Sequence, residues 1–218
     1  MRVVIAGGHG KIALILEKLL TERGDSAVGL IRNPEHAGDL EAVGAEPVVV
    51  DLENATADEV AAHLRGADAV VFAAGAGPGS GIERKTTVDR DAAILLADAA
   101  ERAGVDRYLM ISAMGADEPA SGDDEVFTAY LAAKSAADAA VRERSALNTT
   151  IVRPGGLTDD PATGRVRVAE STGRGTIPRA DVAGMLLALL DAPATGDVTF
   201  ELISGDATVA EAVAVLTP

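Results

Sequence analysis

The first 20 residues of the chain constrain its fold more than any other segment. The apolar run 3–6 is followed at once by a glycine-rich turn, and apolar side chains then recur at i, i+3, i+4 and i+7 from Ile12 to Leu19. This pattern predicts a buried strand, a tight turn and an amphipathic helix, in that order. Glycines allow the sharp turn, and the amide groups and positive dipole end of the helix favour a phosphate group there.

The spacing of the turn is Gly7-x-x-Gly10-x-x-Ala13, a variant of the fingerprint of dinucleotide-binding folds. Alanine replaces the third glycine, and its small methyl group still permits close packing of the helix against the strand. A glycine motif alone is a weak signal, and an ordinary strand-to-helix turn is the alternative. The place of this turn in the first β-α unit, after a strand that starts at residue 2, favours nucleotide binding.

Composition limits the classes of function. The 218 residues suffice for one sizeable α/β domain, and we expect a single domain over 1–218. The absence of cysteine excludes thiol catalysis, disulfides and thiolate metal sites. A formal net charge of −15 argues against a nucleic-acid groove.

Neither a membrane span nor a signal peptide is expected, because no run of about 18 apolar residues occurs and the first strand starts at residue 2. We therefore expect a cytoplasmic protein without a metal site. It should bind a small-molecule substrate, but neither nucleic acid nor a membrane, and act as a monomer or homodimer.

Strand and helix patterns alternate along the rest of the chain. The expected strands are 27–31, 47–50, 69–75, 108–111, 149–153 and 198–203. One helix is expected to end near residue 65, two more to span about 88–103 and 126–144, a fourth to start at residue 181, and a last one to follow a cap at Thr208. A loop at 77–81 is either a flap or a plain linker, and 165–168 lies in a short polar excursion. The alternation predicts an α/β Rossmann fold, with a doubly wound, mostly parallel sheet, helices on both faces and substrate-side elements within 154–218.

The end of the second strand bears on the choice of cofactor. In dinucleotide folds a carboxylate at this place binds the 2′-hydroxyl of NAD, whereas an arginine suits the 2′-phosphate of NADP. Arg32 lies at this end and no acidic residue does. A solvated surface arginine is the alternative, but the position favours NADP(H), with NAD(H) as the second choice.

Three polar residues are candidates for catalysis. Ser112 follows the strand 108–111, and Tyr130 and Lys134 lie four residues apart on the next helix, so both face the same side. We expect all three at the carboxyl edge of the sheet, near the nicotinamide end of a cofactor. The Lys134 ammonium should lower the Tyr130 pKa from about 10, so that Tyr130 acts as general acid or base. Ser112 is expected to bind a substrate carbonyl, and Lys134 the nicotinamide ribose.

Short stretches over nearly the whole chain match one family. They are AGGHGKIA at 6–13, LIRN at 30–33, VVVDLEN at 48–54, VFAAGAG at 71–77, VDRDAA at 88–93, ISAMGAD at 111–117, YLAAK at 130–134, TIVRPGGLTDDP at 150–161 and IPRADVA at 177–183. With them the chain resembles the atypical short-chain dehydrogenases/reductases of the compact NAD(P)H-binding kind. These are related to NmrA-like proteins and to flavin/biliverdin-IXβ reductases, and are often labelled sugar epimerases or dehydratases.

The resemblance implies a set of cofactor-binding residues. The glycine turn would line the pyrophosphate with Gly7, Gly8, His9, Gly10, Lys11 and Ile12; Arg32 and Asn33 would bind the 2′-phosphate, Asp51 and Leu52 the adenine, Ala73, Ala74 and Gly75 the ribose, and Pro154, Gly155, Gly156 and Leu157 the nicotinamide amide. Tyr130 and Lys134 would also contact the cofactor. The interval from Ser112 to Tyr130 is lengthened by a loop rich in Asp and Glu, which makes the role of the serine less secure than that of the tyrosine.

These observations leave three functions open. The first is an NADP(H)-dependent oxidoreductase acting on a small carbonyl, quinone or flavin. The second is a regulator that senses NADP(H) without turnover, and the third is a flavin reductase in which Tyr130 is a bystander. Epimerase or dehydratase chemistry on a nucleotide sugar is less favoured, because only 64 residues follow Pro154.

Overall fold

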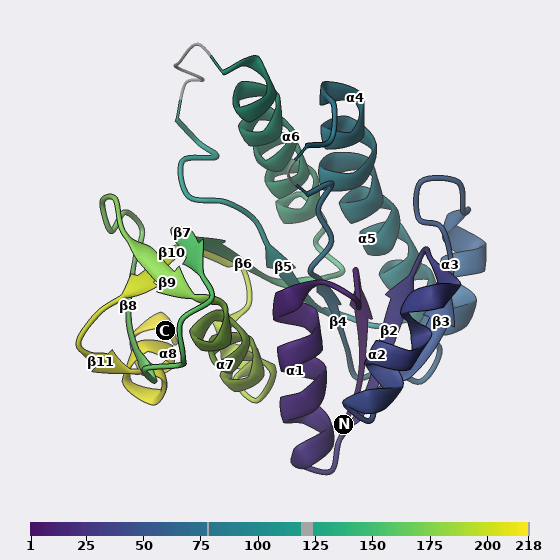
Figure 1. The fold of residues 1–218 in the computed structure, drawn as a ribbon, viewed down its shortest axis with the longest axis horizontal. Helices are drawn as coiled ribbons and strands as arrows, with labels where there is room; N and C mark the ends of the chain where they lie inside the picture. Colours follow the sequence, from purple (N-terminus) through teal and green to yellow (C-terminus); the bar gives the residue numbers. More distant parts are fainter. Residues whose placement is uncertain (78, 119–123, 218) are drawn as a thin grey trace.

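The computed structural model of the protein describes residues 1–77, 79–118 and 124–217. Within this part of the chain, nine strands form one sheet with helices on both faces (Figure 1), which confirms the predicted α/β class. None of the described helices has the length and apolar character that crossing a membrane requires.

The strands are β1 (Arg2–Ala6), β2 (Ser26–Ile31), β3 (Glu46–Val49), β4 (Ala69–Phe72), β5 (Arg107–Ile111), β6 (Asn148–Pro154), β7 (Gly156–Thr158), β8 (Arg165–Ala169), β9 (Thr176–Pro178), β10 (Val198–Ser204) and β11 (Ala207–Thr208). The α-helices are α1 (Lys11–Glu22), α2 (Ala37–Ala42), α3 (Ala57–Leu64), α4 (Ile82–Arg84), α5 (Ala92–Ala103), α6 (Glu125–Arg142), α7 (Arg179–Leu190) and α8 (Val209–Leu216). Shorter elements are the 3-10 helices η1 (Pro34–His36) and η3 (Pro193–Thr195) and the π-helix η2 (Lys85–Asp91).

The strand order places a topological switch beside β1. The strands β3-β2-β1-β4-β5-β6-β10 run parallel in this order, and β8 and then β11 extend the sheet beyond β10. The chain moves outward from β1 to β3 and then returns to β4 on the other side of β1. Open α/β sheets bind ligands at such a point, outside the carboxyl ends of the strands. The order of the strands therefore predicts a cleft where β1 and β4 end.

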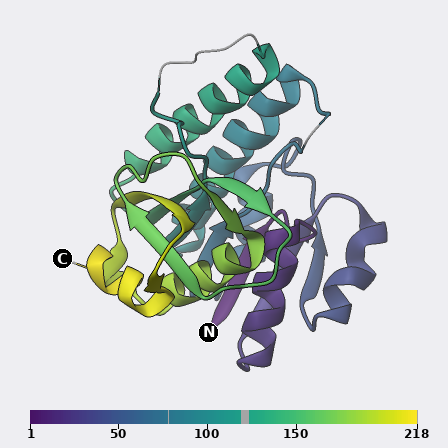
Figure 2. The ribbon, with the colours of Figure 1, turned by 60° about the vertical axis from the view of Figure 1, so that its left-hand side comes forward.

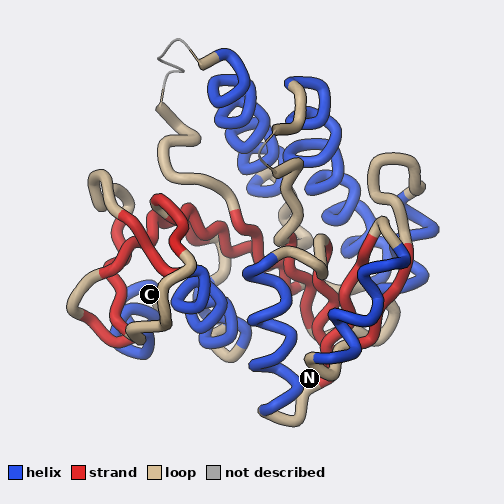
Figure 3. The backbone as a smooth tube through the Cα atoms, viewed as in Figure 1, coloured by secondary structure: helices blue, strands red, loops and turns tan. Residues whose placement is uncertain are grey.

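Alternating side chains of the central strands enter two hydrophobic cores. Val3 and Ile5 of β1 belong to the core that contains side chains of α1, α7 and α8, whereas Val4 and Ala6 belong to the core that contains side chains of α3, α5 and α6. Figure 3 shows these helices on both sides of the sheet, and Figure 2 shows the C-terminal segment, green to yellow, gathered at one end of it. Because both faces are covered, the central strands consist of nearly continuous apolar residues.

Two boundaries differ from the sequence prediction by more than two residues. The strand predicted over 69–75 ends at Phe72, since residues 73–75 leave the sheet and line a cavity. The helix predicted from residue 88 starts at Ile82, as α4, and continues through η2 into α5. π-Helical turns are rare and often lie at functional sites. Of the two loops noted in the sequence, Pro78 and residues 119–123 lie outside the described part of the chain.

The predicted polar excursion at 165–168 is instead the strand β8. Val166 is fully buried, while Arg165 and Arg167 are exposed, which is the period of two of a half-buried strand. β8 pairs with β10 in antiparallel register. A search for apolar runs does not predict this strand, because Arg165 and Arg167 alternate with its apolar residues.

A buried carboxyl group lies beneath the glycine turn. Glu17 of α1 is fully buried, and neither of its side-chain oxygens has a hydrogen-bond partner in the described structure. A Cβ atom on Gly8 or Gly29 would lie 2.9 or 2.5 Å from Glu17 Oε1, so these two glycines leave the space that the carboxyl group occupies. Burial raises the pKa of Glu17 to about 8. Glu17 is therefore mainly neutral in the folded protein at pH 7.

Glu17 should make the fold less stable as pH rises. The pKa is about 8 in the folded protein against 4.5 for an exposed glutamate. Between these values the folded state holds the extra proton, so the free energy of unfolding falls with increasing pH. We expect urea unfolding to show a loss on the order of a few kcal/mol from about pH 5 to pH 8.5, largely absent in Glu17→Gln. The exposed Glu22→Gln is the control; an equal decrease in all three proteins would contradict the prediction.

Candidate functional site

Two adjoining cavities lie at the carboxyl ends of β1, β4 and β5. The larger has a volume of about 580 Å³ and the smaller about 170 Å³, and both are lined by Ala74 and Gly75. Of the residues proposed from the sequence, the larger is lined by Ile12, Ala73, Ser112, Tyr130, Lys134 and Leu157, and the smaller by Gly7, Arg32, Asp51 and Leu52. The cavities together form a cleft at the topological switch of the sheet.

Most amide groups of the glycine turn donate hydrogen bonds to backbone oxygens of the protein itself. The amides of Gly7 and Gly8 donate to Leu30 O at 3.2 and 3.0 Å, and the amide of Gly10 donates to Gly7 O at 2.8 Å. The turn itself therefore offers a phosphate fewer donors than its sequence suggested. Within residues 7–14, the amides that donate no backbone hydrogen bond are those of His9 and of the first turn of α1, Lys11 to Ala13. Such amides at a helix N-terminus favour an anion.

The side chains of His9 and Lys11 point to neighbouring elements. His9 Nε2 lies 2.8 Å from Asp39 Oδ2, and its ring stacks on His36 with 3.6 Å between the centroids. Lys11 Nζ lies 2.6 Å from Asp159 Oδ2 in the segment after β7. Neither residue lines the larger or the smaller cavity of the cleft. Their assigned contacts with a pyrophosphate stay predictions.

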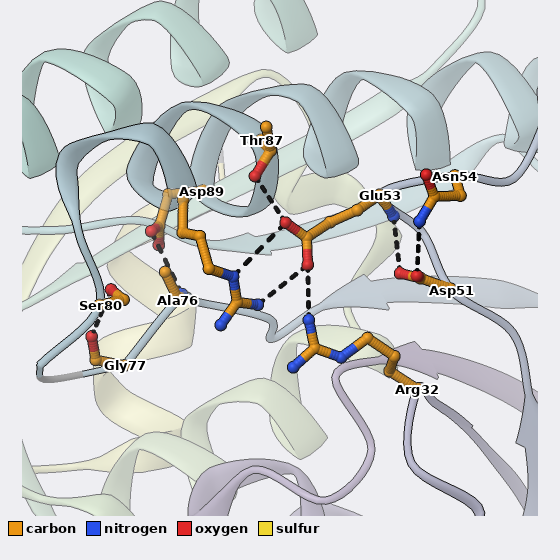
Figure 4. Close-up of polar contacts among 10 residues, drawn as sticks. Arg32, Asp51, Glu53, Asn54, Ala76, Gly77, Ser80, Thr87 and Asp89 are labelled. Atoms are coloured by element: carbon orange, nitrogen blue, oxygen red, sulfur yellow. Dashed lines mark hydrogen bonds and ion pairs between the residues drawn. The ribbon is translucent and has the colours of Figure 1, made fainter.

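The smaller cavity contains a carboxylate that the sequence reasoning missed. Glu53 Oε2 accepts hydrogen bonds from Arg32 Nη1 at 2.7 Å and Arg84 Nη2 at 2.9 Å, and Oε1 accepts one from Thr87 Oγ1 at 2.6 Å. Figure 4 shows Arg32 and Thr87 pointing toward Glu53 from two sides. Burial would raise the pKa of Glu53, but the hydrogen bonds from Thr87 and Arg84 and the two guanidinium charges outweigh it and lower the pKa. Glu53 is therefore ionised at neutral pH.

No acidic residue lies at the end of β2, but in the folded protein one does lie beside Arg32, which the sequence did not predict. Glu53 follows β3, and β3 lies beside β2, which brings residues 21 positions apart together. Asp51 holds this loop, since its Oδ1 accepts from Glu53 N at 3.1 Å and its Oδ2 from Asn54 Nδ2 at 2.7 Å. Asn33 caps η1 through Glu35 N at 3.1 Å and does not line either cavity.

The larger cavity brings together the three catalytic candidates and adds Asp89. Lys134 is almost fully buried; its Nζ donates to Ile111 O at 3.1 Å and lies 3.5 Å from Asp89 Oδ1. The same Nζ is 6.0 Å from the centre of the Tyr130 ring. Asp89 is also buried and accepts from Ala76 N at 3.2 Å. The ammonium group of Lys134 is therefore engaged mainly by Asp89 and a backbone carbonyl.

The expectation that Lys134 lowers the pKa of Tyr130 is wrong. Burial raises the Tyr130 pKa, and the charges of Asp89 and Asp138 raise it further. Burial also lowers the pKa of Lys134, with a partial offset from Asp89. Tyr130 is therefore a neutral phenol at ordinary pH, in a position to donate a proton or a hydrogen bond.

Ser112 presents a buried hydroxyl beside this group. It is 4% exposed, and its Oγ has no partner at hydrogen-bond distance within the described residues. Asp138, fully buried on α6, accepts from Arg153 Nε at 2.8 Å and from Nη2 at 2.7 Å. Burial raises the pKa of Asp138, and the nearby Ser112 hydroxyl and Arg153 partly offset this rise. The Ser112 hydroxyl therefore faces Asp138 on one side and the cavity on the other, where a ligand can give it a closer partner.

Two of the missed acidic residues had signals in the sequence. Asp138 continues the spacing of Tyr130 and Lys134 by another four residues along α6, so it belongs to the same helix face. Asp89 belongs to the stretch VDRDAA, which was noted only for its resemblance. These sequence patterns did not predict that Asp89 pairs with Lys134 or that Asp138 accepts hydrogen bonds from Arg153.

The predicted nicotinamide end is formed mainly by backbone. Leu157 lines the larger cavity. A Cβ atom on Gly155 would lie 2.4 Å from Gly175 O, so this glycine permits close contact between two chain segments. Pro154 ends β6 and Gly156 starts β7, where its amide donates to Gly175 O at 2.9 Å. Contacts of Pro154, Gly155 and Gly156 with a nicotinamide stay predictions.

The cleft has the features that a dinucleotide requires. It lies at the topological switch, it offers the free amides of the first turn of α1, and a Cβ atom on Gly7 would lie 2.6 Å from Ala74 Cα, so only glycine fits between the turn and the cavity wall. Arginine side chains lie at one end and the buried hydroxyl of Ser112 at the other. The residues present therefore fit a nicotinamide dinucleotide.

Comparison with known proteins agrees with this geometry. Residues 7–193 match the NAD(P)H-binding family. The uncharacterized sugar epimerase YhfK of Bacillus subtilis (strain 168) is 38% identical over 213 residues, which cover 97% of this chain and 98% of the relative.

Two solved structures extend the comparison. A Bacillus halodurans protein named for the NAD-dependent epimerase/dehydratase class is 37% identical, with a TM-score of 0.91 over 99% of both chains. The anaerobilin reductase ChuY of Escherichia coli O157:H7 is 26% identical, with a TM-score of 0.75 over 95% of this chain and 99% of ChuY. From this coverage and identity, together with the cleft, we conclude that the chain belongs to the NAD(P)H-binding family.

Proposed function

We propose that the protein is an NADP(H)-dependent oxidoreductase that reduces a small carbonyl, quinone or flavin, with Tyr130 as the proton donor. The observation that carries this proposal is the meeting of Ser112, Tyr130 and Lys134 in one cavity that adjoins the arginine-containing cavity at the switch of the sheet. The volume of about 580 Å³ suits a small substrate beside one end of a cofactor.

A bound nicotinamide cofactor would supply the hydride. The chain would hold it by the free amides at the start of α1, by Arg32 at the adenosine end, and by Ala74, Gly75 and Leu157 along the cavity walls. The buried hydroxyl of Ser112 would donate a hydrogen bond to the substrate oxygen. Tyr130 would donate the proton to that oxygen, and Lys134 would position the site through Ile111 O and Asp89.

The protonation state of Tyr130 supports a role as proton donor. A phenol with a raised pKa stays protonated throughout the neutral range, so little phenolate is present to act as a base, although the phenol is also a weaker acid than one with the ordinary pKa. Reduction of a carbonyl or quinone consumes a proton, whereas the first step of an epimerase removes one. Epimerase activity is the second candidate function, because two similar proteins are named as epimerases. The charges of Asp89 and Asp138, however, oppose the phenolate form of Tyr130 that an epimerase would need.

Replacing Tyr130 tests the proton donor. In a screen of NADPH oxidation with carbonyls, quinones and flavins, Tyr130→Phe should lower turnover by about 100-fold or more and leave the Kd for NADPH nearly unchanged. Tyr108→Phe is the control, because the Tyr108 hydroxyl is buried on Ala93 O outside the cavity. Equal losses of turnover and affinity would show a binding role. If flavin-dependent oxidation of NADPH survives in Tyr130→Phe, the protein is a flavin reductase in which Tyr130 is a bystander. If the wild type binds NADPH but turns over no substrate, the protein is a regulator that senses NADP(H).

The titration of Tyr130 provides an independent test. Burial and two carboxylates raise its pKa, so carbon-13 NMR of the labelled phenol carbon should show no ionisation up to about pH 10, the ordinary value for tyrosine. Tyr108→Phe assigns the signal, since Tyr108 and Tyr130 are the two tyrosines of the chain. A Tyr130 signal that titrates near neutral pH would support the hypothesis that Lys134 lowers the Tyr130 pKa and that Tyr130 acts as a base, and it would count against reduction.

Preference for NADP(H) is a separate prediction that depends on Arg32. Calorimetric titration should show tighter binding of NADPH than of NADH, and Arg32→Ala should weaken NADPH by about tenfold or more through the loss of a charged hydrogen bond. NADH binding should hardly change. Equal affinities of the wild type for the two cofactors would refute the preference.

A further inference from the structure

Two arginines from distant parts of the chain meet at one carboxylate in the smaller cavity. Arg32 follows β2 and Arg84 ends α4, yet both donate to Glu53 Oε2, at 2.7 and 2.9 Å. Two guanidinium groups repel each other unless an anion lies between them. The point where they converge is therefore an anion site built by the fold, and in this structure the occupant is a side chain of the protein itself.

The geometry points to Arg84 as a second cation for the 2′-phosphate of NADP(H), with Glu53 as the internal anion that competes for the same two guanidinium groups. This inference rests on the proposed function, because it assumes that the cofactor lies with its adenosine end in the smaller cavity. It adds two residues that the sequence reasoning did not select. It also makes the choice between NADP(H) and NAD(H) depend on a balance of three charges.

Exposure shows how an external anion would reach the site. The side chains of Arg32 and Arg84 are 54% and 39% exposed, whereas Glu53 is 18% exposed. Each guanidinium carries five N–H donors. Glu53 engages one nitrogen of Arg32, and Nη2 and, at 3.5 Å, Nε of Arg84, so both arginines retain donors for a phosphate arriving from solvent.

The charge of Glu53 opposes that phosphate. Its pKa is lowered, so it remains a carboxylate where a 2′-phosphate would carry close to two negative charges. Like charges at such short range weaken binding, while the neutral ribose hydroxyl of NAD(H) is little affected. Selectivity is then the attraction of two arginines minus the repulsion of one glutamate.

Adenosine fragments without nicotinamide isolate this site from catalysis. We would titrate 2′,5′-ADP, which carries the 2′-phosphate, and 5′-AMP, which lacks it, into the wild type and the variants by calorimetry. Arg84→Ala should weaken 2′,5′-ADP by about tenfold, and Glu53→Gln should strengthen it by about three- to tenfold, with 5′-AMP nearly unchanged in both. Arg84→Lys should fall between, because an ammonium keeps the charge without the planar fork.

Arg90→Ala is the matched control, since Arg90 lies on η2 with 40% exposure, pairs with Asp91 and lines neither cavity. Urea unfolding of each variant shows whether the fold is retained. If Arg84→Ala weakens both fragments equally, Arg84 is merely structural and the inference fails. If Glu53→Gln weakens 5′-AMP without strengthening 2′,5′-ADP, Glu53 is a ribose-binding carboxylate and the inference fails as well.

The outcome is separable from that of the proposed function. Turnover that depends on Tyr130, together with fragment binding that ignores Arg84 and Glu53, would refute this inference alone. Fragment binding as expected, without turnover of any substrate, would refute the oxidoreductase and retain the phosphate site. A wild type that binds neither NADPH nor 2′,5′-ADP would refute both.

Discussion

The close approach of the glycine turn to the loop after β4 determines where the cleft can lie. Gly7 has φ +82°, and a Cβ atom on it would lie 2.6 Å from Ala74 Cα. The contact is therefore made by backbone alone. It holds the start of α1 against residues 73–75, which line the larger cavity, while Ala74 and Gly75 also line the smaller one. The free amides of α1 and the two cavities thus share one edge of the sheet, and every proposed contact with a dinucleotide depends on that arrangement.

The chemistry of the larger cavity depends on how its buried charges are paired. An ammonium group four residues from a tyrosine lowers the phenol pKa only if its charge acts mainly on the phenol. Here Lys134 lies 3.5 Å from Asp89, and burial together with Asp89 and Asp138 raises the Tyr130 pKa. Removing one member of such a buried pair leaves the other uncompensated, which is why Asp89 and Lys134 are best considered as one unit. Tyr130 therefore keeps its proton at neutral pH, and the phenolate form that would act as a base is disfavoured.

The adenosine end illustrates the same principle at the surface. An arginine after β2 is a simple indication of a 2′-phosphate, but its electrostatic effect depends on what the fold places beside it. Glu53 and Arg84 change the local charge from one cation to two cations and one anion. Thr87 holds the glutamate in place at 2.6 Å, so the arrangement is fixed from three separate segments of the chain. In the proposed phosphate site, affinity would thus reflect a difference between opposing charges.

Much of the fold could be predicted from the residues themselves. The α/β class, the order of the elements and the first β-α unit follow from local apolar patterns, because a buried strand and an amphipathic helix each leave a period in the sequence. Even the capping box of α8, from Thr208 to Glu211, was visible. The same local patterns placed Ser112, Tyr130 and Lys134 on elements that end at one edge of the sheet.

The sequence by itself thus determined the class of the fold and most of its elements, and it placed Ser112, Tyr130 and Lys134 at the cleft. It failed where charges hid an alternating pattern, as in β8, and where a helix starts with irregular turns, as in α4 and η2. The tertiary structure alone decided that Asp89 neutralises Lys134, that Glu53 separates Arg32 from Arg84, and that the amides of Gly7, Gly8 and Gly10 are used within the protein. Those outcomes depend on distances between segments remote in the chain, and a charge or hydrogen bond acts through distance rather than through sequence separation.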